Sequence, residues 1–424
     1  MWGWRSARTV LVGTAVAAFV LFCVLPLAYM VAVWLVEPGP KAAIFRALLL
    51  DSRQRGLLLN TALLGIGTAL TATIVGVPLG VALARMALPF KAGARILLAA
   101  PALLPSYVVG LAWLSSGQTA SMPGLLAAII VLTAVLYPLP MLMTEAAARG
   151  IEPRLEEAAS LTARPGRVLW RITLPLIRPS IVAGALVVFV LAISDFGVPA
   201  LLRVRVFTTE IFTAFAALYD SARATALALP LLLLTLCVVV ASARLAGNGI
   251  VATRRTLAGG ELQAFDQWRL ASTAMVIAVV MLAVILPVAV LAREARHISS
   301  WISVLNGSGE AIGKSLWLAA TGATLVCALG LGLGYARRMA SRAVGEAGDV
   351  LFIVLFAVPG TIVGVALIGL WNRSGVPGMV YATNGMFLLV YLAKLMPLAA
   401  LAVAASLRRV PTSHEEAAAV SGAS

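Results

Sequence analysis

Residues 76–85 read GVPLGVALAR, and residues 330–339 read GLGLGYARRM. Two glycines and an alanine recur at matching positions: Gly76 with Gly330, Gly80 with Gly334, and Ala82 with Ala336. Glycines four positions apart on an apolar helix allow a second helix to approach closely. The recurrence therefore predicts the same closely packed helix in two parts of the chain.

The correspondence extends well beyond these two stretches. An offset of 254 residues continues through the next apolar run, and after one outer loop it becomes 259 residues. The matched positions include Pro105 with Pro359, Gly110 with Gly364, Pro138 with Pro397, Arg149 with Arg408 and Glu157 with Glu416. An offset that changes only once indicates an internal duplication. We predict two homologous helical bundles, at residues 1–250 and 251–424, related by a pseudo-twofold axis.

The composition places the chain in a membrane. It is 61% hydrophobic and 12% charged, whereas about 25% of residues in a soluble domain are charged. A spanning helix needs about 20 apolar residues, because its backbone must form all its hydrogen bonds internally. Ten runs meet this requirement: 9–36, 58–84, 96–114, 124–143, 180–202, 222–243, 271–291, 313–336, 350–371 and 381–405. We therefore predict an all-α polytopic membrane protein, with six of these spans in the first half and four in the second.

The charges indicate an orientation rather than a nucleic acid partner. The formal net charge of +15 is spread between the apolar runs and does not form one patch. With a cytoplasmic N-terminus, the inner segments carry about twice as many Lys and Arg residues as the outer ones, although the first outer loop is locally basic. The first apolar run is too long for a cleavable signal peptide, so we expect a retained span.

The stretch Gly313-Lys314-Ser315 resembles the end of a phosphate-binding loop. Such a loop needs a glycine five positions before Gly313, where this chain has Ser308. The repeat pairs Lys314-Ser315 with Asn60-Thr61, which predicts a helix start at the outer side of the membrane. We therefore expect no nucleotide site in this chain.

The residues of common catalytic and metal centres are sparse. Cys23, Cys237 and Cys327 lie far apart in apolar runs, and His297 and His414 are the two histidines. They form no ligand spacing and no disulfide framework. We predict no catalytic residues, no metal ligands and no cofactor bound by this chain, which argues against a membrane-embedded enzyme.

The most informative loop is the inner one at residues 145–179, EAAARGIEPRLEEAASLTARPGRVLWRITLPLIRP. It predicts a short helix rich in Glu and Ala, a break at residues 164–166, a second short helix and a stop at Pro175. Small alanine side chains let another protein approach closely, and Glu157 supplies charge at the edge. A merely solvated basic loop is the alternative, but the counterpart HEEAAAVSGAS at 414–424 keeps the same core. We therefore predict two protein-docking loops.

These loops resemble the cytoplasmic signature of the permease subunits of ATP-binding-cassette importers: Glu-Ala-Ala, three residues, Gly, nine residues, then Ile-x-Leu-Pro. The matching residues are Glu157, Ala158, Ala159, Ile172, Leu174 and Pro175 in the first half, and Glu416, Ala417, Ala418 and Gly422 in the second. From Glu157 to Pro175, the first copy is one residue shorter than the signature. The glycine position is occupied by Ala163 when counted from Glu157, or by Thr162 when counted from Pro175. Together with the repeat, the resemblance covers essentially the whole chain.

The resemblance implies a type I importer fold and a set of partners. These are a dimer of ATPase subunits that carries ATP and Mg²⁺, an extracytoplasmic solute-binding protein, and the lipid bilayer of a bacterial cytoplasmic (inner) membrane. The residues implied in ATPase coupling are Glu157, Ala158, Ala159, Arg164, Gly166, Leu174, Pro175, Glu416, Ala417, Ala418 and Gly422. The stretch 194–220 resembles the fused permeases of ferric-iron importers most, and related fused systems carry thiamine, phosphonates or polyamines.

The two halves differ in length. The first half continues past Glu157 through two more spans to about residue 245, whereas the second, with its coupling loop from residue 411, ends soon after Glu416. We therefore expect a truncated chain with ten of twelve spans.

Two charged residues lie at or within the spans and are candidates for the transport pathway. Asp195 either lines the entrance or meets the membrane interface. Lys394 lines the pathway, is buried in its neutral form or packs on a carbonyl, because an intramembrane cation costs about 3 kcal/mol or more unless it faces a cavity or a partner. An ion-coupled secondary transporter is the alternative class, and it would require more paired intramembrane charges than these two.

Overall fold

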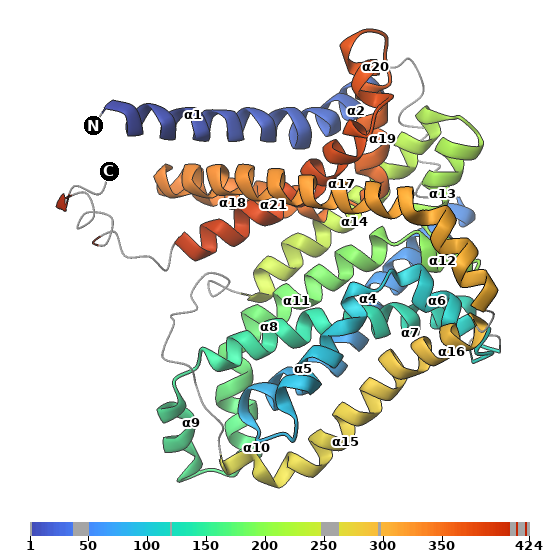
Figure 1. Ribbon diagram of the computed structural model, residues 1–424. Coiled ribbons are helices and arrows are strands. Elements are labelled where there is room, and N and C mark those ends of the chain that lie inside the picture. Colours follow the sequence, from blue (N-terminus) through green and yellow to red (C-terminus); the bar gives the residue numbers. More distant parts are fainter. Residues whose placement is uncertain are drawn as a thin grey trace. The chain divides into compact units, whose positions relative to one another are not determined.

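The computed structural model describes residues 2–36, 51–118, 121–246, 263–295, 298–407, 413, 420 and 421. Within these ranges every regular element is a helix, as the all-α prediction requires (Figure 1). The longer helices are α1 (Trp2–Phe19), α2 (Leu25–Val36), α4 (Ser52–Arg85), α5 (Lys91–Ala99), α6 (Ser106–Ser115), α7 (Gly124–Leu136), α8 (Pro138–Arg149), α9 (Pro153–Ser160), α11 (Leu174–Ser194), α14 (Ser221–Ala246), α15 (Arg269–Val280), α16 (Leu286–Glu294), α17 (Ile298–Met339), α18 (Arg342–Ala357), α19 (Gly360–Trp371) and α21 (Gly385–Leu407). Shorter helices are α10 (Pro165–Val168), α12 (Gly197–Leu201), α13 (Phe207–Phe212) and α20 (Val376–Tyr381), with short 3₁₀ or π-helical turns η1 (Val20–Val24), η2 (Ala100–Leu103), η3 (Leu169–Thr173), η4 (Thr213–Ala217), η6 (Gln263–Trp268) and η7 (Met281–Ile285).

The helices are long and apolar enough for a polytopic membrane protein. In the described residues, seven helices could cross a membrane by length and composition, and three bent helix pairs raise the number to ten. The ten apolar runs of the sequence correspond to these seven helices and three pairs. The prediction of ten spanning segments thus agrees with the upper number.

Two of the predicted spans are sharply broken. α5 with η2 meets α6 at 95°, and α18 meets α19 at 94°. Each break has a proline immediately before the second helix, Pro105 in the first half and Pro359 in the second, and the residue before each proline is extended. Proline lacks an N–H and disfavours helical conformation in the preceding residue. Residues 96–114 and 350–371 are therefore not the continuous spans that the sequence predicted.

The repeated glycines pack as their spacing predicts. Gly76 and Gly80 on α4 lie against α8, where a Cβ built on Gly76 would come within 2.7 Å of the Tyr137 backbone oxygen. Gly330 and Gly334 on α17 lie against α21 in the same way: Ala399 is 2.7 Å from a Cβ built on Gly330. Pro140, which also contacts Gly76, and Ala399 are themselves paired by the offset of 259 residues. The two halves thus use equivalent residues for the same helix contact.

The chain forms two compact units that do not follow the predicted halves. Unit 1 comprises Met1–Phe45, Ile211–Leu232 and Ser299–Ser424, and unit 2 comprises Arg46–Glu210 and Leu233–Ile298. In unit 1, α1 and η1 pack on helices of the second half: Phe19 meets Phe352 edge to face at 5.1 Å, and the Cys23 thiol donates to the Leu392 backbone oxygen at 3.7 Å.

Unit 2 shows the reciprocal arrangement. There α15 contacts α4 and α5, α16 contacts α6, and Leu286 packs against a core cluster of the first half. The first span of each half therefore belongs to the compact unit that holds the core of the other half. The boundary at residue 250 remains a prediction.

Two local predictions were wrong. The segment around Lys314 is not a helix start, because α17 begins at Ile298 and runs without interruption past it; Lys314 is exposed and pairs with Glu310 one turn earlier. The helix also does not stop at Pro175. The π-helical turn η3 precedes this proline, and an inserted residue of this kind accommodates the missing N–H, so α10, η3 and α11 form one helical span over Pro165–Ser194.

Candidate functional site

The predicted docking loop folds into α9 and α10, at the ends of the membrane helices α8 and α11 (Figure 1). Glu152 is extended before α9, and Pro153 occupies its first turn, where a proline costs no intrahelical hydrogen bond. The helix ends at Ser160, and α10 begins with Pro165 after the extended Arg164. The predicted short helix and the break after it are therefore present.

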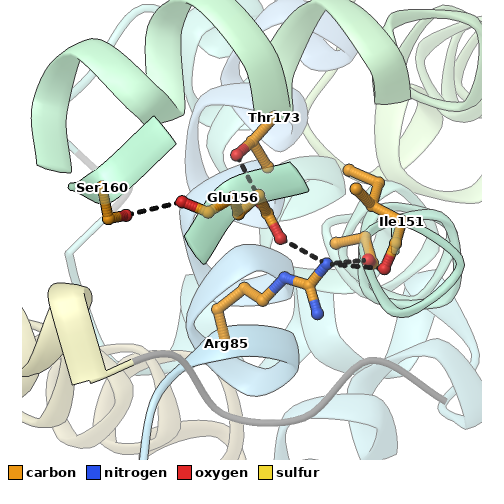
Figure 2. Close-up of polar contacts among 6 residues, drawn as sticks. Arg85, Ile151, Glu156, Ser160 and Thr173 are labelled. Carbon is orange, nitrogen blue, oxygen red and sulfur yellow. Dashed lines mark hydrogen bonds and ion pairs between the residues drawn. The ribbon is translucent and has the colours of Figure 1, made fainter. Parts of the chain in front are cut away.

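One side of α9 is fixed to the membrane helices by a buried ion pair. Figure 2 shows Arg85, the last residue of α4, facing Glu156 on α9, with 2.6 Å between guanidinium Nη2 and carboxylate Oε2. Neither side chain is exposed to solvent. The Thr173 hydroxyl donates to the other carboxylate oxygen, Oε1, at 2.6 Å. Three separate stretches of the chain thus meet at one carboxylate.

Arg85 also holds the end of α8. Its Nη2 donates to the backbone oxygens of Ala148 at 2.7 Å and Ile151 at 3.2 Å. Ala148 lies in the last turn of α8, where carbonyls lack intrahelical donors, and Ile151 lies two residues beyond the end of this helix. The Arg85 guanidinium therefore donates both to backbone carbonyls at the end of α8 and to the Glu156 carboxylate of α9.

A buried pair of this kind depends on both partners. Burial raises the pKa of the Glu156 carboxyl, whereas the Thr173 hydroxyl and Arg85 both work to lower it. Removal of one partner of a buried ion pair typically costs about 3–5 kcal/mol, because the other charge is left uncompensated. The anchor of α9 thus requires Arg85 and Glu156 as a unit.

This anchor was not predicted, although the sequence contains a signal for it. The signature match counted from Glu157 was one residue short of Pro175. Counted from Ile172 and Pro175, the glutamate of the signature falls on Glu156, which is the buried and paired residue. Glu157 stands where the signature has its first alanine, and its side chain is exposed.

Two large apolar side chains of this region are exposed. Leu161, directly after α9, is 88% exposed, and Trp170 in η3 is 73% exposed. Glu157 and Ala158 on α9 are also exposed, while Ala159 is half-buried. Exposed Leu and Trp side chains in a segment that also exposes small and charged residues are typical of a protein-binding surface.

The remaining predicted residues of this loop occupy mixed positions. Arg164 and Pro175 are exposed, and Leu174 is half-buried. Gly166 lies close to the Trp268 ring, which is 3.9 Å from a Cβ built on this glycine. α10 is thus partly covered by η6 and is less accessible than α9.

A second buried acid lies near the end of α8. Glu145 is 1% exposed and pairs with Arg149 at 2.7 Å and with Arg95 at 3.2 Å. Residues 145–149 belong to α8, so the segment that connects α8 with α9 begins after Arg149.

In the second half, the predicted coupling residues Glu416, Ala417, Ala418 and Gly422 lie outside the described residues. The helices that lead to them are described. Arg338, at the end of α17, donates to the Leu407 backbone oxygen at 2.6 Å. Leu407 is the counterpart of Ala148 under the offset of 259 residues, so both halves place an arginine on the same carbonyl.

The two pathway candidates have partners within the protein. Asp195 Oδ1 accepts from the Val198 N–H at 2.8 Å, at the start of α12, and Oδ2 accepts from the Ser106 hydroxyl. Lys394 Nζ donates to the backbone oxygens of Phe356 at 2.8 Å and Val358 at 2.6 Å. Asp195 therefore caps a short helix, and Lys394 satisfies the end of α18 at the 94° break. Both contacts are structural, and a role in the pathway stays a prediction.

No group of three or more His, Cys, Asp or Glu side chains that could hold a metal ion occurs among the described residues.

Comparison with known proteins matches residues 76–248 to the family of binding-protein-dependent transport system inner membrane components. The chain is 33% identical over 160 residues to the molybdenum transport system permease protein ModB of Mycobacterium tuberculosis, covering 34% of this chain and 60% of that protein. It is 34% identical over 142 residues to the molybdate/tungstate permease WtpB of Thermococcus kodakarensis, covering 32% of this chain and 56% of WtpB.

A ferric-iron system is also among the similar proteins. The Fe(3+)-transport system permease protein FbpB 2 of Haemophilus influenzae is 27% identical over 194 residues, covering 46% of this chain and 38% of that protein. The chain spans about 60% of the length of the ModB proteins it matches. The matched family segment contains Gly76, Gly80, Arg85 and the whole α9–α10 region.

Proposed function

We propose that this chain is the transmembrane permease of an ATP-driven importer, with no ATPase activity of its own. The proposal rests on the structure of α9, which is anchored by the buried Glu156 and carries the exposed Glu157 and Ala158. This helix lies within the segment that matches inner-membrane transport components. A surface held rigidly from behind is suited to receive force from a partner protein.

The partner that fits this surface is a dimer of ATPase subunits, which would carry ATP and Mg²⁺. One subunit docks on the exposed side of α9 in the first half, and the second docks on the region of Glu416 in the second half. Closure of the ATPase dimer on ATP moves these regions and switches the permease between inward-facing and outward-facing states. ATP and transported ligand are coupled because each has unequal affinity for the two states.

The other expected partner is a solute-binding protein outside the bilayer. The permease would lie in a bacterial cytoplasmic membrane with its N-terminus and α9 on the cytoplasmic side. The two halves, related by a pseudo-twofold axis, would form the passage between them. In this arrangement the binding protein selects the ligand, so the permease needs no tight ligand site.

Ferric iron is the first candidate ligand, from the resemblance of residues 194–220 to fused ferric permeases and the match to FbpB 2. Molybdate or tungstate is the alternative candidate. It is supported by the matches to ModB and WtpB, which are 33% and 34% identical to this chain. Thiamine, phosphonates and polyamines are further ligands carried by fused permeases.

The test is reconstitution in proteoliposomes with the ATPase and the binding protein encoded beside it. ATP hydrolysis and uptake are measured with the binding protein loaded with ferric ion, molybdate, tungstate, thiamine or a phosphonate. The proposal expects one ligand to stimulate hydrolysis and to accumulate inside. Uptake driven by an ion gradient in the absence of the ATPase would instead establish a secondary transporter.

A further inference from the structure

We propose that Glu156 and Arg85 are positioning residues that transmit movement of the docking helix α9 to the membrane helix α4, an inference that rests on the proposed function. In this arrangement Glu156 does not contact the ATPase. It faces the permease, whereas Glu157 and Ala158 face the partner.

The carboxylate of Glu156 is the only side-chain group on α9 that is fully buried in the described structure, and both its oxygens are engaged, one by Arg85 and one by Thr173. A displacement of α9 therefore acts on these two contacts. Arg85 terminates α4, and Thr173 terminates η3, which continues into α11.

The helices that carry the ion pair and its neighbours are in close contact. A Cβ built on Gly80 of α4 would lie 2.4 Å from the Met141 backbone oxygen on α8, and one built on Gly65 would lie 2.5 Å from Ile193 on α11. Closely packed helices move as units rather than deforming locally. A shift of α9 passed to Arg85 would thus move α4 together with its neighbours.

The second half of the chain contains the arginine–carbonyl contact of this arrangement. Arg338 binds the Leu407 backbone oxygen as Arg85 binds that of Ala148. The signature match from Glu416 to Gly422 makes Glu416 the counterpart of Glu156, and Glu416 lies outside the described residues. We therefore expect substitution of Glu416 to reproduce the effect of substituting Glu156.

The anchor can be tested in the purified permease alone. Arg154 and Arg167 are exposed trypsin sites on α9 and α10, whereas Arg164 is followed by Pro165 and is not cleaved. E156A should raise the rate of cleavage at these sites roughly tenfold or more, because an unanchored helix opens more often. The conservative variants E156Q and R85K, which retain hydrogen-bonding groups, should fall between E156A and the wild type.

E157A is the matched control, since it removes a carboxylate of the same helix that is exposed. It should be cleaved at the wild-type rate. Equal cleavage rates in E156A and E157A would overturn the anchor, and so would wild-type rates in E156Q and R85K if E156A does not fold.

Transmission is tested in the reconstituted complex, with binding protein loaded with ferric ion or molybdate. E156A should co-purify with the ATPase but lose most of the ligand stimulation of hydrolysis, and E156Q should recover part of it. E157A should instead weaken co-purification. Full stimulation in E156A would overturn the proposal. If the wild-type complex shows no stimulation with any ligand, the proposed function fails, and trypsin cleavage still decides whether Glu156 anchors α9.

Discussion

Gly80 lies directly against the backbone of Met141, so that α4 and α8 touch without an intervening side chain. In the second half Gly334 on α17 lies against the side chain of Val403 on α21, with 2.3 Å between a Cβ built on Gly334 and Val403 Cγ1, and Val403 is the counterpart of Thr144, which also contacts Gly80. Small residues at such contacts replace the hydrophobic driving force that is absent between helices in a bilayer. The tight contact of α4 with α8 is the structural basis for the transmission proposed above.

We predict that G80A lowers the melting temperature of the permease. The added methyl group would meet a backbone oxygen, which cannot move without shifting α8, and such overpacking typically costs about 1–3 kcal/mol. G93A is the matched control, because a Cβ at Gly93 of α5 meets nothing within 4 Å and alanine favours a helix. Thermal unfolding in detergent measures both variants, and equal melting temperatures would refute the packing argument.

We predict that K394M destabilises the permease without changing its ligand preference. The substitution keeps the size of the side chain but removes donors from the carbonyls of Phe356 and Val358, and unsatisfied buried carbonyls cost about 1–3 kcal/mol each. K314M should have little effect, because Lys314 forms an exposed pair. A change of ligand preference in K394M with unchanged melting temperature would show that Lys394 serves the pathway instead.

Variants at Asp195 distinguish between two roles of this residue, as the cap of a helix and as a charge in the transport pathway. D195N keeps an acceptor for the Val198 N–H, and the Ser106 hydroxyl can reorient to accept from the amide. We therefore expect D195N to unfold and transport nearly as the wild type does. D195A removes the cap and should lose about 1 kcal/mol of stability. Comparable loss of transport in both variants, with D195N still stably folded, would indicate that the charge itself is required.

The membrane class, the ten apolar segments and the short helix α9 in the loop at residues 145–179 could be predicted from the sequence. Apolar runs of sufficient length have few alternatives to a spanning helix. The glycine contacts could also be predicted, because Gly76, Gly80, Gly330 and Gly334 recur at one spacing. These features depend on local patterns, which a single sequence contains.

The features that could not be predicted depend on contacts between distant segments. The sequence gives no sign that α1 packs with the second half and α15 with the first. The importance of Glu156 over Glu157 arises from Arg85, 71 positions earlier in the chain, and from Thr173. The 95° and 94° breaks at Pro105 and Pro359 were missed because apolar composition alone does not separate a straight span from a bent pair.

The sidedness of α9 is a separate prediction. In a chain whose Cys23, Cys237 and Cys327 have been replaced, E157C should react with a membrane-impermeant maleimide in inside-out vesicles and not in intact cells. L218C, in the exposed turn before α14, should show the reverse pattern. Labelling of E157C in intact cells would place α9 on the outer side, where no ATPase can reach it.

The central claim is that the exposed side of α9 receives an ATPase, and site-specific photo-cross-linking tests it most directly. A benzophenone amino acid replaces Glu157 in one sample and Leu218 in another, and each permease is irradiated in membranes that contain the neighbouring ATPase. We predict a covalent ATPase adduct from position 157 and none from position 218. A complex that co-purifies yet gives no adduct at position 157, or gives one at position 218, would contradict the claim.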